Sequence, residues 1–224
     1  MWQALVNGVA SILVLCYDLT VSLGIPSYAL AIVMLTLFIK IITYPLTYKQ
    51  THSMRSMQEL QPKIKALQEK YRKNPEKLNQ ATMELYKDNK VNPMAGCFPL
   101  LIQMPILIAL FQALQKFQYN DIGSAFLWIP HLKDPDPTYI VPLLVAVTTF
   151  LQTKFTTPNT NVEGQAAMTQ KMMLYTMPIF IGYISIKFPA GLGIYWIFFS
   201  IFGTLQMLYI YRHPTMKKGE VGRK

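Results

Sequence analysis

The chain has 224 residues, of which 52% are hydrophobic and 14% are charged, with a formal net charge of +10 and a mean hydropathy of +0.25. This balance excludes an ordinary soluble enzyme and indicates an integral membrane protein. Long apolar stretches predict an all-α fold with five transmembrane helices. An amphipathic helix on the outer face precedes them, and a cytoplasmic helical hairpin interrupts them.

Residues 1–23 predict a helix that lies in the outer membrane interface. Apolar residues recur on one helical face, at Leu5, Val9, Ile12, Leu13 and Cys16, and polar residues interrupt the other faces, at Gln3, Asn7, Ser11 and Asp18. The alternative is a sixth span, because Asp18 is the one charged residue of this stretch. A signal peptide would begin with basic residues, and this segment has none. The next residues, Gly24, Ile25 and Pro26, predict a hinge.

Segment 24–47 predicts the first span, and it contains the candidate functional residue. Lys40 is the one charge in the run Ser27–Leu46. A charge within a span is costly and is a functional-site hypothesis by default. The alternative is snorkelling, because the run ends about six residues later, roughly 9 Å at helical rise, within reach of a lysine side chain. Thr36 and Thr43 extend a polar stripe on a similar face, which favours a polar groove.

Segment 48–92 predicts a cytoplasmic hairpin of two helices. Apolar residues recur at steps of three and four, at Met57, Leu60, Ile64, Leu67 and Tyr71. Asn74 and Pro75 predict the N-cap and the first residue of the second helix. Because Pro62 either breaks or begins the first helix, the residues before it alternatively continue the first span into the cytosol. The hairpin either packs on itself or docks varied apolar partners through three methionines expected to be exposed, Met54, Met57 and Met83.

Four further spans are predicted in the second half of the chain. Apolar runs place them at 96–117, 139–156, 171–187 and 189–211. The connecting segments are an extracytoplasmic loop at 118–138 and a cytoplasmic loop at 157–170, followed by a basic cytoplasmic tail at 212–224. Polar side chains inside these spans either line a wet cavity or hydrogen-bond a neighbouring helix, and they are Gln103, Gln112, Gln152, Tyr195, Trp196, Ser200 and Gln206.

Basic residues concentrate on one predicted side of the membrane. The hairpin, the loop after Phe155 and the tail carry most of them, whereas the opposite side holds Lys116, Lys133 and Lys187. By the positive-inside rule, the N-terminus is outside and the C-terminus is cytoplasmic. The sequence shows no transit peptide, so we expect a multi-pass protein of a bacterial cell membrane.

Catalytic chemistry and cofactors are not expected. His52, His131 and His213 fall on different sides of the membrane, and Cys16 and Cys97 fall on different segments. The sequence contains neither a glycine-rich phosphate loop nor a zinc-protease motif. We therefore expect a protein that is not an enzyme and that has no metal, nucleotide or other cofactor.

Several motifs, taken together, resemble a known family. They are KIITYPLT at 40–47, LQPKIKALQEKY at 60–71, NPMAGCFPLLIQMPILIALF at 92–111, WIPHLKDPDPTYIVP at 128–142 and KFPAGLGIYW at 187–196. In this order they resemble the YidC/Oxa1/Alb3 family of membrane protein insertases, over essentially the whole chain. The resemblance implies a five-span core without the large extracytoplasmic domain that some bacterial members carry.

The resemblance also implies a mechanism of insertion. In this family a basic residue of the first span lies in a hydrophilic groove, open to cytosol and lipid, and attracts acidic extracytoplasmic segments of clients. That residue is usually arginine; the matching Lys40 keeps the charge but loses the bidentate guanidinium. Thr36 and Trp196 match positions that contact a client's transmembrane segment, and Gln152 matches a groove-lining amide. The expected groove is completed by Tyr195, Thr43 and Ser200.

The partners expected from the resemblance are client membrane proteins, the Sec translocon, anionic lipids, and the ribosome, held by the basic tail and hairpin. Two other classes of function are weighed against an insertase. A structural or assembly subunit would have its polar stripe covered by a partner helix. A small transporter would show inverted repeats and paired intramembrane charges, which this sequence lacks.

Overall fold

The computed structural model describes residues 2–72, 74–89, 91, 98–116, 123–156, 168 and 171–212. Its helices are α1 Trp2–Ser22, α2 Tyr28–Ile42, α3 Tyr44–Glu59, α4 Gln61–Lys70, α5 Pro75–Asp88, α6 Phe98–Lys116, α7 Ile140–Thr156, the π-helix η2 Met172–Thr176, α9 Met177–Ser185 and α10 Ala190–Arg212. The described residues are therefore all-helical, as predicted, apart from an isolated bridge between Phe126 and Ile129. The predicted loop 157–170, except Met168, and the predicted tail beyond Arg212 lie outside the described residues.

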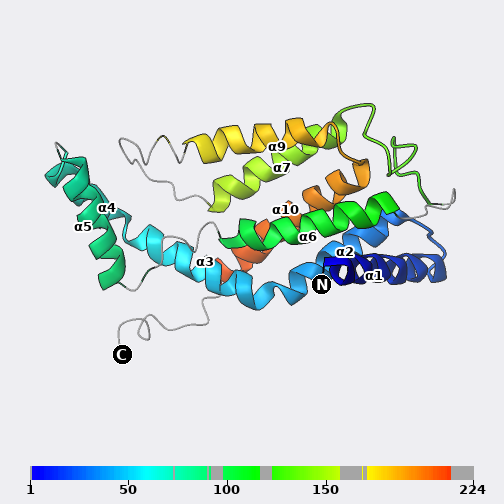
Figure 1. Ribbon diagram of the computed structural model, residues 1–224, viewed down its shortest axis with the longest axis horizontal. Coiled ribbons are helices and arrows are strands. Elements are labelled where there is room, and N and C mark those ends of the chain that lie inside the picture. The colour runs from blue at the N-terminus through cyan, green and yellow to red at the C-terminus, as the bar shows by residue number, and fades with distance from the viewer. Residues whose placement is uncertain are drawn as a thin grey trace.

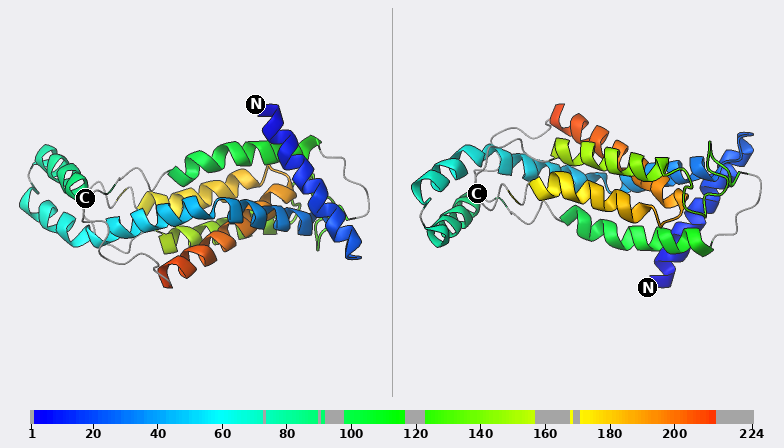
Figure 2. Two further views of the ribbon diagram at one scale, coloured as in Figure 1. Left: turned by 90° about the horizontal axis from the view of Figure 1, so that it is seen from below. Right: turned by 90° about the horizontal axis from the view of Figure 1, so that it is seen from above.

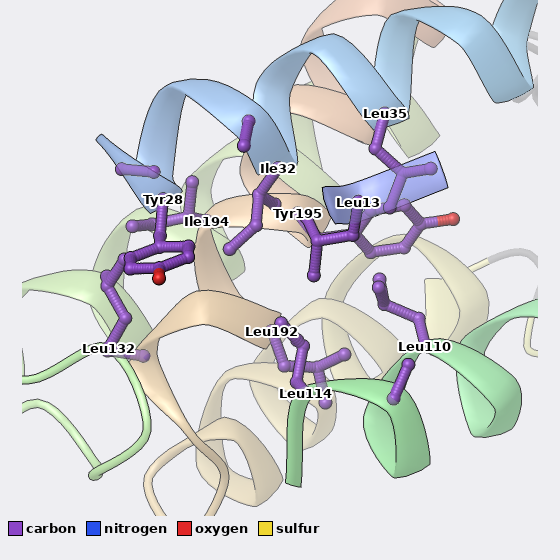
Figure 3. Packing of buried hydrophobic residues seen from close by; sticks show 14 of the residues in the cluster. Leu13, Tyr28, Ile32, Leu35, Leu110, Leu114, Leu132, Leu192, Ile194 and Tyr195 are labelled. Carbon is purple, nitrogen blue, oxygen red and sulfur yellow. The ribbon is translucent and has the colours of Figure 1, made fainter. Parts of the chain in front are cut away.

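Helix α10 lies at the centre of the bundle. It packs against α7 on one side and α2 on another, while α7 also packs against η2 and α9 (Figure 1). The buried core takes side chains from α1, α2, α6, α7 and α10 and from the loop before α7. Its fully buried members include Leu13, Ile32, Leu35, Leu110 and Tyr195, which Figure 3 shows. Close packing of this kind stabilises helix contacts in a membrane, where lipid tails are as apolar as leucine.

Helix α1 crosses the other helices steeply at one end of the bundle (Figure 2). Its packed face is formed by Val6, Val9, Leu13 and Cys16, among other residues. The predicted face was wrong at Leu5, which is 40% exposed, because Val6 points into the core instead. The indole of Trp2 donates a hydrogen bond to Gln112 Oε1 of α6 at 3.1 Å. These contacts attach α1 to α2 and α6.

By length and composition alone, two described helices could cross a membrane, α1 and α10. The number rises to three if α2 and α3 together form one span, although these helices meet at 64°. The apolar stretches tested in the predicted second, third and fourth spans are shorter, at 10–17 residues, and they are Gln103–Gln115, Ile140–Thr156 and Met172–Ser185. The helical architecture is therefore established, and five spans remain a prediction.

The bend between α2 and α3 lies at Thr43. Proline at position 45 has no N–H to bond the carbonyl of Ile41, four residues earlier, so the regular helix cannot continue there. Helix α3 then extends to Glu59, and α4 begins at Gln61 with Pro62 in its first turn. The residues before Pro62 thus form α3, a separate helix at 64° to α2, and their continuation of the first span into the cytosol stays a prediction. The hairpin itself consists of α4 and α5.

The hairpin has a small core of its own. Leu60, Ile64 and Val91 are buried in it, with Met57, Leu85 and Tyr86 packed around them. As predicted, Asn74 caps α5, and its Oδ1 accepts a hydrogen bond from Lys77 N at 3.0 Å. Burial raises the pKa of the Tyr86 hydroxyl. The hairpin lies at the end of the molecule opposite α1 (Figures 1 and 2).

The segment 123–139, which contains the described part of the predicted extracytoplasmic loop, bonds to the starts of α2 and α10. The backbone carbonyl of Gly123 accepts from Tyr28 N at the start of α2, at 3.1 Å. Carbonyls of Leu132 and Asp134 accept from the first two residues of α10, at 2.9 and 2.8 Å. These bonds satisfy backbone N–H groups that helix N-termini leave without intrahelical partners. The loop thereby fixes the ends of α2 and α10 relative to each other.

Candidate functional site, a buried lysine between three helices

Lys40 lies on the inner face of α2, two turns after Ile32 and one turn after Thr36. Only 7% of its surface is exposed, although it lies close to the end of the helix at Ile42. A snorkelling lysine would extend its ammonium towards the interface. Instead, Lys40 Nζ lies 3.3 Å from the centre of the Phe199 ring on α10. The side chain therefore points into the bundle.

A second helix brings an amide to the same place. A methyl group added at Gly203 would lie 2.9 Å from Lys40 Nζ and 2.7 Å from Gln152 Nε2. The ammonium of α2 and the amide of α7 thus both lie against the backbone of α10 at Gly203. The structure brings together two of the predicted groove residues, Lys40 and Gln152.

No described carboxylate neutralises this ammonium. Within the described ranges, the side-chain ion pair is that of Arg55 and Glu59 in α3, at 3.6 Å. A lysine at the centre of a membrane helix costs about 3 kcal/mol on insertion scales, and an unpaired charge in a dry interior costs several. The site therefore suits an anion or water as the partner of Lys40.

Further polar groups on α10 and α3 also have no hydrogen-bond partner among the described residues. Ser200 is fully buried, and its Oγ has no hydrogen-bond partner among the described residues. The same holds for Gln206 Oε1, and for Gln50 Nε2 in α3. Ser200, Gly203 and Gln206 recur every three residues, so they share one side of the helix. An ammonium, an amide and a hydroxyl form a set that can bind a carboxylate.

Other predicted site residues have partners within the protein. Thr36 is fully buried and donates to the carbonyl of Ile32 at 2.6 Å, while Thr43 donates to Ile39 O at 2.8 Å, at the bend. Trp196 Nε1 donates to Thr149 Oγ1 of α7 at 3.1 Å, and the Tyr195 hydroxyl accepts from Gln103 Nε2 of α6 at 2.6 Å. Such interhelical bonds stabilise helix packing in membranes. Tyr195 and Trp196 therefore have structural contacts in this state.

Two residues of the site were not predicted from the sequence, Phe199 and Gly203. They are an ordinary phenylalanine and glycine in an apolar helix, so composition does not mark them. Their spacing from Trp196, three and seven residues, places them on the same helical face and was the signal available.

The predicted docking methionines differ in exposure. Met83 of α5 is 50% exposed, in agreement with the prediction. Met54 and Met57 of α3 are half-buried, and Met57 packs against the core of the hairpin. The expectation of exposure was wrong for these two, because α3 packs its side chains against neighbouring helices.

Comparisons with known proteins identify the family. The model of the family described as 60Kd inner membrane protein matches residues 20–218. The membrane protein insertase YidC of Clostridium perfringens is 43% identical over 199 residues, covering 86% of this chain and 82% of the relative. The insertase YidC 1 of Listeria monocytogenes is 43% identical over 198 residues, covering 87% of this chain and 67% of the relative.

A solved structure gives the same result. A crystal structure of active YidC insertase with its first transmembrane domain resolved aligns with a TM-score of 0.69 and 27% identity. The alignment covers 95% of this chain and 47% of that one, so this chain spans about half the length of the solved relative. The chain therefore belongs to the YidC family of membrane protein insertases.

Proposed function

We propose that this chain inserts client membrane proteins, and that the polar face shared by α2, α7 and α10 receives the client. The observation that carries the proposal is the Lys40 ammonium, buried between these helices with no described acidic partner. An acidic residue in a client's extracytoplasmic segment supplies the missing anion. The client's own apolar span then provides the driving force, at about 25 cal/mol per Å² of apolar area removed from water.

The polar face acts as a water-containing groove in this proposal. Ser200 Oγ and Gln206 Oε1 are buried without partners in the described part of the chain, and leaving such groups dry costs about 1–3 kcal/mol each. Water that hydrates them offsets this cost. A short polar tail of a client would therefore enter a medium closer to water than to lipid, which lowers the barrier to its transfer.

The relatives and the apolar helices indicate a multi-pass protein of the bacterial inner membrane. We propose five spans, formed by α2, α6, α7, η2 with α9, and α10, with α1 in the outer interface. The position of α1 across one end of the bundle, opposite the hairpin, supports this assignment (Figure 2). The basic residues of the hairpin favour the cytosol, so the N-terminus lies outside and the C-terminus inside.

Partners other than clients are proposed from charge and exposure. The segment 212–224 holds five Lys or Arg and one Glu, a composition that attracts ribosomal RNA or anionic lipid through counterion release. Exposed Met83 on α5 offers an adaptable apolar contact to a docking protein such as the Sec translocon. Binding through these basic residues is expected to weaken steeply with salt.

A cysteine introduced at position 200 tests whether the groove is wet. Ser200→Cys changes one atom at a fully buried site, and Cys97→Ser removes the competing thiol. Native Cys16, buried in the packed face of α1, is the matched control within the same molecule. In membrane vesicles, a small water-soluble maleimide should label the thiol introduced by Ser200→Cys at least tenfold faster than it labels Cys16.

Equal, slow labelling of both thiols would contradict a groove. It would favour an assembly subunit, in which a sealed helix interface covers the polar face. Labelling is compared only for protein that retains the thermal unfolding transition of the native protein.

A further inference from the structure

The Lys40 ammonium contacts an aromatic ring. Its Nζ lies 3.3 Å from the centre of the Phe199 ring, well within the roughly 6 Å over which a cation is attracted to a ring face. Since no described carboxylate pairs with Lys40, the ring is the main electrostatic partner that the described protein provides. Burial strengthens this attraction because the ammonium has lost most of its water.

The space for the ammonium is provided by the absence of a side chain at Gly203. A Cβ there would lie 2.9 Å from Lys40 Nζ and 2.7 Å from Gln152 Nε2, distances that real Cβ atoms essentially never show. Phe199 and Gly203 are four residues apart, so the ring and the open space lie one above the other on one face of α10. Any larger residue at 203 would displace both polar groups.

The position of the ring is itself supported from a third helix. The ring centres of Tyr195 and Phe199 are 5.7 Å apart, and Tyr195 is fully buried. Its hydroxyl accepts a hydrogen bond from Gln103 Nε2 of α6 at 2.6 Å. The contacts from Gln103 through Tyr195 to Phe199 thus join α6 to the ammonium of α2 across α10.

We propose that Phe199 and Gly203 are positioning residues that hold the Lys40 ammonium inside the bundle until an acidic client group takes the place of the ring. This inference rests on the proposed function for its second half, the replacement by the client. Its first half concerns the client-free protein alone. The ring then competes with an acidic client for the ammonium, whereas a neutral client segment, which forms no ion pair with Lys40, does not depend on the ring.

The first half is tested by the reactivity of the Lys40 amine. The client-free protein in nanodiscs is treated with a water-soluble amine reagent, and modification of Lys40 relative to exposed Lys49 is followed by mass spectrometry. Phe199→Leu should raise Lys40 modification by about twofold to thirtyfold, the range that corresponds to one cation–π contact. Phe199→Tyr retains a ring and should behave as the native protein. Phe198→Leu is the matched control, because the Phe198 ring packs against Phe202.

Gly203→Ala tests the same arrangement without changing the ring. It should also raise Lys40 modification at least twofold, whereas Gly8→Ala, with nothing within 4 Å of the added methyl, should not. Unchanged Lys40 modification in both Phe199→Leu and Gly203→Ala, with native-like thermal unfolding, would overturn the proposal. An equal rise in Phe199→Leu and Phe198→Leu would overturn it as well, since it would reflect general loosening of α10.

The second half is tested with two clients that differ only in an acidic or neutral outer tail. Phe199→Leu removes the ring that holds the ammonium in the client-free protein. The variant should therefore favour the acidic client over the neutral one at least twofold more strongly than the native protein does. If Lys40 modification rises in Phe199→Leu but the preference for the acidic client does not, the ring contact is supported and the proposed attraction of acidic clients is rejected. Loss of acidic preference in Lys40→Glu, with unchanged modification in Phe199→Leu, would reject the ring contact and keep the proposed function.

Discussion

The Asp136 carboxylate accepts a hydrogen bond from the backbone N–H of Val141 at 2.7 Å, which connects the loop before α7 to the first turn of that helix. Its other oxygen accepts from the backbone N–H and the hydroxyl of Thr138, at 3.0 and 2.7 Å. Asp136 is 4% exposed, so these bonds replace most of its water. A negative charge also suits the positive end of a helix. Asp136 therefore fixes α7, which carries Gln152, to the loop that holds α2 and α10.

Asp136→Ala should lower the free energy of unfolding by about 2–3 kcal/mol, because the change leaves buried N–H groups without their charged acceptor. Asp134→Ala is the matched control. Asp134 contributes its backbone carbonyl to α10, and its exposed side chain can be removed with a change of about 0.5 kcal/mol or less. Thermal unfolding of the two variants in the same detergent measures the difference. Equal stability of both variants would show that the carboxylate does not anchor the loop.

The contribution of Asp136 should depend on pH. Burial by itself raises the pKa of this carboxyl, but hydrogen bonds from Val141, Thr138 and Trp128 outweigh it and hold the pKa below its ordinary value of 3.8. A folded-state pKa below the unfolded one stabilises the protein above the unfolded pKa, and this stability is lost as pH falls through the folded pKa.

The stability difference between the native protein and Asp136→Asn should thus be constant above about pH 5 and shrink below about pH 4. Unfolding temperatures measured from pH 3 to pH 7 test this dependence. A difference that grows as the pH falls would mean that the hydrogen bonds do not favour the charged form.

The sequence was sufficient to predict the helices, because apolar runs and proline positions determine them locally. Residue Asn74 was recognised as a cap from its place before Pro75, and the structure confirms its hydrogen bond. The packed face of α1 was assigned one position away at Leu5, since both Leu5 and Val6 are apolar and only contacts with α2 and α6 decide between them. Periodicity identifies a face, and tertiary packing selects its centre.

The candidate site was predictable in part. Lys40 could be identified because it is a lone charge in an apolar run. Burying one charge costs so much free energy that a single such residue indicates a functional site. Phe199 and Gly203 could not be found in the same way. Their role depends on which side of α10 faces α2. It also depends on the close approach of Lys40 and Gln152 to the backbone at Gly203, which nothing in the sequence indicates.

The path of the client helix is predicted to run beside α10. A photocrosslinker at Trp196, which is half-buried, should capture a stalled client, whereas one at Trp128 in the outer loop should not. Capture is also expected at Thr36, and because Thr36 is fully buried in the client-free structure, its capture would mean that the helices around it separate. Crosslinked products are identified by mass spectrometry. Capture confined to α6 and α9 would place the client elsewhere.

Charge substitutions at Lys40 test the attraction of acidic clients. Lys40→Arg keeps the positive charge and should retain insertion, although its larger planar group must fit beside Phe199 and Gly203. Lys40→Glu should impair insertion most for clients with acidic outer tails, because two carboxylates then repel each other at the site. A protease-protection assay measures translocation of the tail, with an acidic-tailed and a neutral-tailed client compared in each variant.

Lys40→Gln provides the matched control for these substitutions, since it removes the charge at similar length and leaves no new anion in the span. Lys40→Gln should reduce insertion of the acidic client to the level of the neutral client, and insertion of the neutral client should not change. Thermal unfolding of each variant separates loss of attraction from loss of fold. If Lys40→Glu inserted both clients equally well while remaining folded, the ammonium would have no part in client selection, and its burial would have to be explained by packing against Phe199 alone.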